Sequence, residues 1–357
     1  MGIAFDHKTL GQRVIFGTGE AVANTTSSVK ELGSERVLLI AGTSSQELAT
    51  SISAQVPGAV RIDEVIQHVP AENAAQAVAT AQESACDAIV CVGGGSATGL
   101  AKAVALKTAL PIVALPTTFS GSEATDVWGI TDQGRKSTGS DARVLPAVVV
   151  YDASLTAGLP AHLAIASGIN AMAHAIDGFW APRTDPINRA MGAEALRALV
   201  PGLKALHRAP GDIDAREQTL YGAYLAAVAF ASAGSGLHHK ICHVLGGRYG
   251  LSHAEMHSIV LAYVTAYNAP AAPHAAKRIS ETFDGLPAEE ALFRFREDVD
   301  APKSLAALGL NEEDLPEAAA LCLEVVPATN PRTVTRQDLE NILRLAWSGE
   351  PIEKGQL

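Results

Sequence analysis

The sequence predicts an α/β domain built on a parallel sheet, followed by a domain made only of helices. Up to about Leu159, short apolar runs alternate with helix patterns, as in chains whose parallel strands are joined by crossover helices. Beyond that point helix patterns follow one another, without a comparable series of strands. Because 357 residues can form two separate cores, we expect an α/β domain at residues 1–158 and a helical domain at residues 159–357.

The expected strands of the first domain are short apolar runs. The clearest lies at residues 37–42, where a continuous apolar run is typical of a strand buried on both faces of a sheet. Helix patterns separate the runs, from about Ser45 and again at residues 71–86. The expected strands are 13–19, 37–42, 60–65, 87–92, 111–116 and 147–151.

The second domain is expected to be a set of closely packed helices, because alanine is abundant and only 5% of the residues are aromatic. Each helix is indicated by apolar residues that recur at helical spacing. The expected helices are 163–180, 186–207, 217–233, 253–267, 287–299, 315–325 and 335–347.

Composition argues against two classes of partner. With 48% apolar and 18% charged residues, the chain is globular and not disordered. Its net charge of −11, with no long basic run, argues against nucleic acid. Residues 218–239 carry no formal charge, but their polar residues and glycines fit a buried helix followed by a turn better than a membrane span. We therefore expect neither a nucleic-acid nor a membrane partner.

The cysteines and the N-terminus predict a cytoplasmic protein. Cys86, Cys91, Cys242 and Cys322 show no CxxC spacing, so neither a disulfide framework nor a zinc knuckle is indicated. Reduced thiols are the simplest account of them. The first residues lack the charged and apolar regions of a signal peptide.

A glycine-rich turn follows the strand expected at residues 87–92. Gly93, Gly94, Gly95 and Ser96 lie where this strand turns into a helix. Consecutive glycines let the backbone approach a phosphate closely, and a helix N-terminus presents free N–H groups and a positive dipole. The turn matches neither a GxGxxG fingerprint nor a P-loop, so read alone it also fits a tight connection.

Hydroxyl residues follow two other expected strands. Open α/β sheets bind ligands at the carboxyl ends of their strands. Two such loops at one sheet edge therefore favour a site for a pyrophosphate and a ribose. The alternative is a loop that only caps the next helix. At Gly42-Thr43-Ser44 no acidic residue clamps a ribose, so we expect NADPH to be accepted as well as NADH. The candidate residues after the strand expected at residues 111–116 are Thr117, Thr118, Ser120 and Ser122.

Five of the eleven histidines lie between Gly236 and His257. His239 and His243 are four residues apart, as are His253 and His257, so each pair shares one face of a helix. Clustered imidazoles bind a metal, move protons or bind an anion. The alternative is a set of ordinary core or surface histidines.

Taken together, these residues resemble the iron-containing alcohol dehydrogenase family, and within it the maleylacetate reductases. The resemblance covers essentially the whole chain. Its anchors are Gly93–Ser96 with Lys102, residues 116–118 with 120–123, residues 168–174, the histidine segment, and Asn330-Pro331-Arg332.

The resemblance implies a dehydroquinate-synthase-like fold, in which a dinucleotide-binding α/β domain and a helical domain enclose the active site between them. It also implies a homodimer, and it places Lys136 in a loop that faces the cofactor. In the metal-dependent members of the family an Asp and three His hold a divalent metal. The matching positions here are Asn170, His174, His239 and His253, while His243 matches the histidine beside the nicotinamide.

Asn170 departs from the metal-dependent pattern. A neutral amide in place of a carboxylate weakens the binding of a dication, so we expect no metal. Gly99 stands where many family members have an Asp, and both departures are similar to the maleylacetate reductases. Protonatable imidazoles without an anionic Asp suit a small dianionic substrate.

The implied reaction is the reduction of maleylacetate, or of substituted maleylacetates, to 3-oxoadipate by NADH or NADPH during the degradation of aromatic compounds. His243 is the expected proton donor or relay, and His174, His239 and His253 are expected to polarise an oxygen or bind a carboxylate. Three alternatives stay open: a metal-dependent alcohol or polyol dehydrogenase, a relative of dehydroquinate synthase, and a catalytically silent dinucleotide-binding protein.

Overall fold

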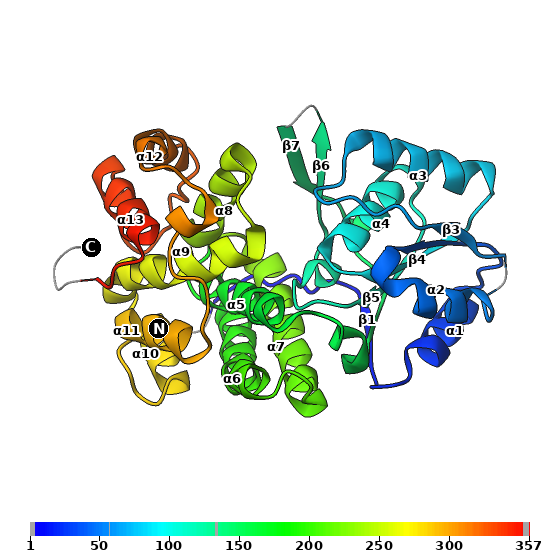
Figure 1. Ribbon diagram of the computed structural model, residues 1–357, viewed down its shortest axis with the longest axis horizontal. Coiled ribbons are helices and arrows are strands. Elements are labelled where there is room, and N and C mark those ends of the chain that lie inside the picture. Colours follow the sequence, from blue (N-terminus) through cyan, green and yellow to red (C-terminus); the bar gives the residue numbers. More distant parts are fainter. Residues whose placement is uncertain (1–3, 57, 133–134, 353–356) are drawn as a thin grey trace. The chain divides into compact units, whose positions relative to one another are not determined.

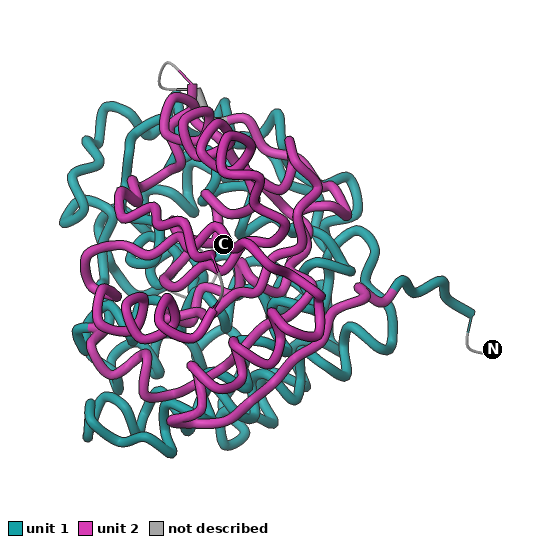
Figure 2. The backbone as a smooth tube through the Cα atoms, turned by 90° about the vertical axis from the view of Figure 1, so that its right-hand side faces the viewer, with its two compact units in different colours: residues 1–8, 160–357 teal, residues 9–159 magenta. Residues whose placement is uncertain are grey.

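The computed structural model describes residues 4–56, 58–132, 135–352 and 357. Two compact units make up the chain: Thr9–Leu159, and Pro160–Leu357 together with the residues that precede Thr9 (Figure 2). The sequence had assigned those preceding residues to the α/β domain. The described ones among them cluster with the helices instead, and the partly buried His7 Nδ1 lies 2.7 Å from Asp185 Oδ2 in the helical unit.

The first unit contains a six-stranded sheet in the order β1-β8-β5-β4-β2-β3, and every neighbouring pair in it is parallel (Figure 1). This confirms the predicted α/β fold. The strands are β1 (Arg13–Phe16), β2 (Val37–Ala41), β3 (Val60–Ile62), β4 (Ala88–Gly93), β5 (Ile112–Pro116) and β8 (Val148–Tyr151). The helices are α1 (Ala21–Glu31), α2 (Gln46–Ser53), α3 (Ala71–Glu83) and α4 (Gly95–Thr108).

Helices cover both faces of this sheet, which explains why its central strands are apolar throughout. Successive side chains of a strand point to opposite faces. Leu38 and Ile40 of β2 accordingly join a core with alanines of α3 and α4. Val37 and Leu39 join a second core with residues of α1 and α2. All five residues of β2 are buried as a result.

A separate antiparallel hairpin, β6 (Val127–Asp132) and β7 (Arg135–Ser140), was not predicted. Its strands are mostly polar and only partly buried, so they lack the apolar alternation that marks a strand. The hairpin is tied to the sheet unit at Thr131, whose N–H donates to Val69 O at 3.0 Å and whose hydroxyl donates to His68 O at 2.8 Å.

The second unit is helical throughout the part that the structure describes, as the sequence predicted. Its α8 begins one residue after Gly236, and α10 was not among the expected helices. The helices are α5 (Ala161–Gly178), α6 (Pro186–Arg208), α7 (Ile213–Ala233), α8 (Leu237–Tyr249), α9 (His253–Asn268), α10 (Pro273–Thr282), α11 (Ala288–Asp298), α12 (Leu315–Leu323) and α13 (Arg336–Ser348).

Small residues let α6 and α7 pack closely. A Cβ atom added at Gly222 of α7 would lie 2.7 Å from Leu199 Cγ of α6, and one added at Gly202 would lie 2.7 Å from Thr219 Oγ1. Among the described residues, no single helix is both long and apolar enough to span a membrane. Only α7 and α8 together meet that length and composition, and the chain bends by 95° between them.

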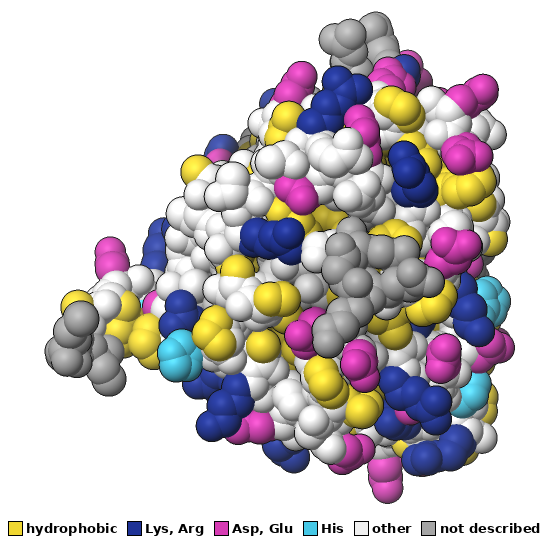
Figure 3. Space-filling view, turned by 90° about the vertical axis from the view of Figure 1, so that its left-hand side faces the viewer, with side chains coloured by type: hydrophobic (Ala, Val, Ile, Leu, Met, Phe, Trp, Pro, Cys, Tyr) yellow, Lys and Arg dark blue, Asp and Glu magenta, His cyan; other side chains and the backbone are white. Residues whose placement is uncertain are grey.

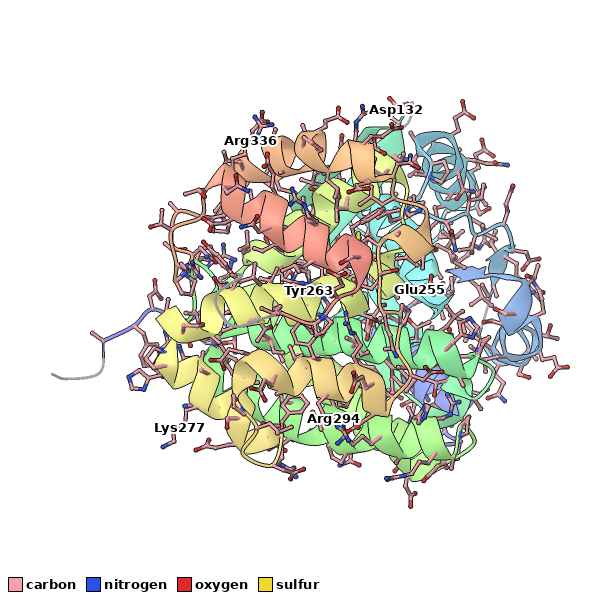
Figure 4. All side chains as sticks on the ribbon, turned by 60° about the vertical axis from the view of Figure 1, so that its left-hand side comes forward. Asp132, Glu255, Tyr263, Lys277, Arg294 and Arg336 are labelled. Atoms are coloured by element: carbon pink, nitrogen blue, oxygen red, sulfur yellow. The ribbon has the colours of Figure 1, made fainter. Side chains whose placement is uncertain are left out.

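A further core, in the helical unit, is formed by α8, α9, α12 and α13. Tyr263 lies inside this core and donates from its hydroxyl to Glu350 O at 2.9 Å, whereas Lys277, Arg294 and Arg336 point outward (Figure 4). On the outer face of the molecule shown in Figure 3, acidic and basic side chains are interspersed. In the helical unit, Arg336 Nε pairs with Glu340 Oε1 at 3.0 Å.

Candidate active site

The sheet brings the three predicted cofactor loops to one edge. Ala41 at the end of β2 pairs with Val92 of β4, and Gly93 at the end of β4 pairs with Pro116 of β5. All three strands are parallel, so the loops that follow them leave the sheet side by side. The loops contain residues 42–44, 93–96 and 117–122.

The glycine loop and the threonine loop touch each other. A Cβ atom added at Gly94 would lie only 2.9 Å from Thr118 Cγ2, and Thr118 Oγ1 lies 3.3 Å from Ser120 Oγ. Gly94 is also the N-cap of α4, and no side chain caps the N-terminus of this helix. The bare backbone and the uncapped N–H groups form a cradle that suits a phosphate group.

Lys102 of α4 is hydrogen-bonded to the threonine loop at Ser122. The buried Lys102 Nζ donates to three backbone carbonyls: Ser122 O at 2.7 Å, Val127 O at 2.8 Å and Thr125 O at 2.9 Å. Burial lowers its pKa to about 7. Lys102 therefore fixes the loop that carries Ser122. Lys136 lies in β7, and its side chain is outside the described part of the structure.

In the helical unit, α5, α8 and α9 bring the predicted histidines together. His174 of α5 stacks on His239 of α8, with ring centroids 4.8 Å apart and ring planes at 12°. The ring of the exposed His243, one turn further along α8, lies 6.1 Å from that of His239. Phe230 of α7 packs against His174 and His239 at 4.6 Å and 4.3 Å.

Two histidines outside the predicted catalytic set complete the cluster. The ring of His257 lies 4.4 Å from that of the exposed His253 and 4.9 Å from that of His239. The Nδ1 atom of His257 lies 2.8 Å from His238 Nε2, and Cys242 Sγ lies 3.7 Å from His238 Nε2. His257 could have been included in the predicted catalytic set, because it follows His253 by four residues on one helix.

A buried carboxylate orients His239. Asp177 Oδ2 lies 2.8 Å from His239 Nδ1 and also accepts from the backbone N–H groups of His239 and Gly236. Trp180 Nε1 donates to Asp177 Oδ1 at 3.2 Å. Because an ionised carboxylate only accepts, the ring proton of His239 is held on Nδ1 and its Nε2 presents a lone pair. Burial raises the pKa of Asp177, and these N–H donors oppose the rise.

The cluster contains several polar atoms that are buried and have no hydrogen-bond partner among the described residues. They are Asn170 Oδ1, His174 Nδ1, His238 Nδ1, His239 Nε2 and His257 Nε2. Buried polar groups are normally satisfied, so unpartnered atoms gathered in one place indicate a site for a ligand or water. Asn170 lies one turn before His174 on α5, as the predicted site requires.

Burial favours the neutral form of these imidazoles. It lowers the pKa of His174 to about 4, and it lowers the pKa of His239 and His257 well below the usual range. Neighbouring imidazoles lower the last two pKa values further. The sequence suggested that protonatable rings suit a small dianion. At neutral pH these buried rings are uncharged until a negative ligand arrives, so their protonation would accompany the binding of that dianion.

Comparison with known proteins connects both units to one family. The iron-containing alcohol dehydrogenase family matches residues 11–153, and the C-terminal part of that family matches residues 164–347. The chain belongs to the iron-containing alcohol dehydrogenase family. The maleylacetate reductase of Pseudomonas sp. strain P51 is 41% identical to it over 349 residues, which cover 97% of this chain and 99% of that relative.

Solved structures agree with this assignment. An iron-containing alcohol dehydrogenase from Corynebacterium glutamicum has a TM-score of 0.95 and 49% identity, and the match covers 98% of both chains. Maleylacetate reductase from Agrobacterium tumefaciens has a TM-score of 0.92 and 36% identity, covering 98% of this chain and 99% of that one. The predicted family and fold are therefore confirmed.

The family name implies iron, but the family's ligand positions fit a dication poorly in this chain. Asn170, His174, His239 and His253 offer one amide oxygen and three imidazoles, so no anionic donor balances the charge. Among the described residues, one group of three His, Cys, Asp or Glu side chains offers ligand atoms that all lie within 4.8 Å of one another: His238, Cys242 and His257. None of these three was a predicted ligand position.

Gly99, the other departure, has a packing reason. A Cβ atom added there would lie 2.8 Å from Val69 Cγ2, so Val69 occupies the space that a larger residue would need.

Proposed function

We propose that this chain reduces maleylacetate, and substituted maleylacetates, to 3-oxoadipate with NADH or NADPH. The observation that carries the proposal is the buried group of Asn170, His174 and His239, whose unpartnered atoms form a polar site without an anionic donor. Relatives named maleylacetate reductase, about 41% identical over nearly the whole chain, support it.

The α/β unit would hold the dinucleotide. The bare backbone of Gly93–Gly95 and the N-terminus of α4 suit the pyrophosphate, and Thr117, Thr118 and Ser120 supply hydroxyls beside it. Thr43 and Ser44, both exposed at the end of β2, leave room for a 2′-phosphate on the adenosine ribose. The reduced nicotinamide supplies a hydride to the substrate's C=C bond, which is conjugated with its ketone.

The imidazoles would bind the substrate and stabilise its developing charge. Reduction adds the hydride to the carbon β to the ketone, moves the electron pair onto the ketone oxygen, and ends with a proton on the α carbon. His239 is suited to the oxygen or to a carboxylate, because Asp177 behind it favours a protonated ring once a dianion lies in front. His174 stacks on that ring and lines the same site.

His243 would relay the proton to the α carbon. It is exposed, and it lies one turn from His239 on the same helix, so it connects the site to solvent. A general acid in this position contributes about 10²–10⁴-fold to the rate. The overall reaction consumes one hydride, from the nicotinamide, and one proton, from solvent.

A metal-dependent alcohol dehydrogenase is the second candidate. The close group of His238, Cys242 and His257 favours it, because two imidazoles and a thiolate are ligands that zinc prefers. Against it stands the lack of an anionic donor at the family's own metal position.

One assay separates the two candidates. Protein stripped of metal by chelation is mixed with NADH and maleylacetate, and NADH oxidation is followed alongside the oxidation of simple alcohols by NAD⁺. We expect full maleylacetate reduction without metal and no gain on adding Fe²⁺ or Zn²⁺. Alcohol oxidation that appears only with metal would favour the second candidate. Inactivity with every unsaturated or carbonyl diacid would indicate a silent dinucleotide-binding protein.

A further inference from the structure

A hollow lies in the helical unit, and none of its lining residues was predicted as a site residue. Its volume is about 390 Å³, within the size range of small-molecule pockets. The turn between α5 and α6, the start of α10 and the loop before α13 form its walls. Its lining residues include Trp180, Arg189, His274, Arg278, Thr329 and Pro331.

The polar groups of this hollow are all neutral or cationic. Arg189, His274 and Arg278 line it, and none of its described lining residues carries a carboxylate. His274 and Arg278 are four residues apart on α10, so they share one face of that helix. The N-terminus of α10, which adds positive dipole, is at Pro273 in the same wall. Three cationic or protonatable groups thus converge in a chain of net charge −11.

The guanidinium groups of Arg189 and Arg278 make few hydrogen bonds to the described residues. Arg278 donates no side-chain hydrogen bond to any described residue, and Arg189 donates one long bond, from Nε to Phe179 O at 3.4 Å. Elsewhere in the described chain, several arginines pair with a carboxylate, as Arg143 does with Asp141 and Arg197 with Glu194. Guanidiniums that lack a carboxylate partner at a partly buried site are suited to a carboxylate ligand, which they bind with two parallel N–H bonds.

The rest of the lining is largely apolar. Alanines and prolines make up half of the lining residues, beside Phe179 and Trp180, and the indole N–H of Trp180 donates to Asp177. The loop that carries Thr329 and Pro331 is anchored next to them, where the side-chain amides of Asn330 and Asn268 donate to each other at 2.8 Å and 3.0 Å. An apolar wall beside free cations suits an organic acid better than a bare inorganic ion.

We propose that this hollow binds a small organic carboxylate with an apolar body, and that Arg189 and Arg278 hold its carboxylate. None of the clustered histidines lines this hollow, although Trp180 in its wall donates to Asp177, and the proposal does not depend on the proposed reductase activity. Only residues of the helical unit form it.

Isothermal titration of the full-length protein with benzoate tests the proposal, with benzyl alcohol as the uncharged analogue and inorganic phosphate as the bare anion. We expect benzoate to bind and benzyl alcohol not to bind. Arg278→Gln and Arg189→Gln should each weaken benzoate binding about tenfold or more, because each removes charge-assisted bonds. His243→Ala should bind benzoate as the wild type does, which separates this hollow from the histidine cluster.

Lys277→Gln is the matched control. It removes the same charge from the neighbouring position of α10, but Lys277 is exposed and pairs with Glu281 at 3.8 Å. Its benzoate affinity should equal that of the wild type, and thermal melts establish that every variant is folded. Equal affinity in the wild type and Arg278→Gln, equal binding of benzyl alcohol, or binding of phosphate without benzoate would each overturn the proposal.

Discussion

At the scale of single residues, Asp177 has the clearest positioning role in the histidine cluster. It fixes the proton of His239 on Nδ1 and supports the charged form of that ring when a dianion binds. Asp177→Asn keeps the shape but removes the charge. We expect kcat/KM for maleylacetate to fall about 10–100-fold, as when a carboxylate behind a functional histidine is lost.

A pH profile separates this role from simple packing. In the wild type, substrate binding should take up a proton, so KM rises with pH. That dependence should be weaker in Asp177→Asn. Asp141→Asn, which alters an exposed carboxylate paired with Arg143, is the control and should change neither quantity. Unchanged kcat/KM in Asp177→Asn would remove the positioning role.

His243 carries the proton-transfer step of the proposed mechanism. His243→Phe keeps an aromatic ring on α8 but cannot relay a proton, so kcat should fall about 10²–10⁴-fold. Single-turnover measurements of NADH oxidation report the loss directly. His162→Phe, at an exposed position of α5, should retain wild-type turnover. A His243→Phe enzyme with wild-type kcat would assign the proton to another group.

Sequence spacing predicted some members of the site and not others. His239 and His243 were found because residues four apart share a helix face, and the structure places them on α8. Asp177 and Phe230 were not found, and His238 was counted in the histidine segment without a role, because their contacts cross between helices whose packing no local pattern records. The sequence also could not predict that the buried rings are neutral, because their lowered pKa follows from burial in the folded protein.

At the scale of elements, the sequence predicted those strands and helices whose buried residues form an apolar pattern. The central strands β2, β4 and β5 are buried along nearly their whole length, so their apolar runs were plain. Helix α10 buries only Ala275 and Ile279, and the hairpin of β6 and β7 is largely polar. Each of these elements offers few apolar residues to mark it in the sequence, and both were missed.

The end of β2 is the element that should decide between the two cofactors. Thr43 begins a short 3₁₀ turn there and is exposed. The wild type should use NADPH as well as NADH, because no carboxylate is present to repel a 2′-phosphate. Thr43→Asp should lower kcat/KM for NADPH at least about tenfold relative to NADH, by repulsion and by hydrogen bonds to the ribose.

Steady-state rates with both cofactors measure this preference. Thr43→Asn, which matches the size of Asp without its charge, is the control and should keep the wild-type ratio. Strict use of NADH by the wild type, or an unchanged ratio in Thr43→Asp, would mean that the ribose lies elsewhere.

At the scale of the whole molecule, the buried histidines tie the stability of the fold to pH. Burial lowers the pKa of His174 to about 4, whereas a histidine in an unfolded chain has a pKa of about 6.5. As pH falls below about 6.5, the unfolded chain takes up a proton that the folded chain refuses, so unfolding becomes easier. The loss continues until about pH 4, where the folded protein binds that proton too.

His174→Asn isolates this effect, because Asn is neutral at every pH and all other titrating groups stay in place. Between about pH 7 and pH 5, the free energy of unfolding should fall by about 2 kcal/mol more in the wild type than in the variant. Urea denaturation at each pH measures the difference. A substrate dianion should reduce it, because negative charge beside the rings raises their pKa in the folded state. Parallel curves for the two proteins would mean that His174 is protonated, or open to water, in the folded state.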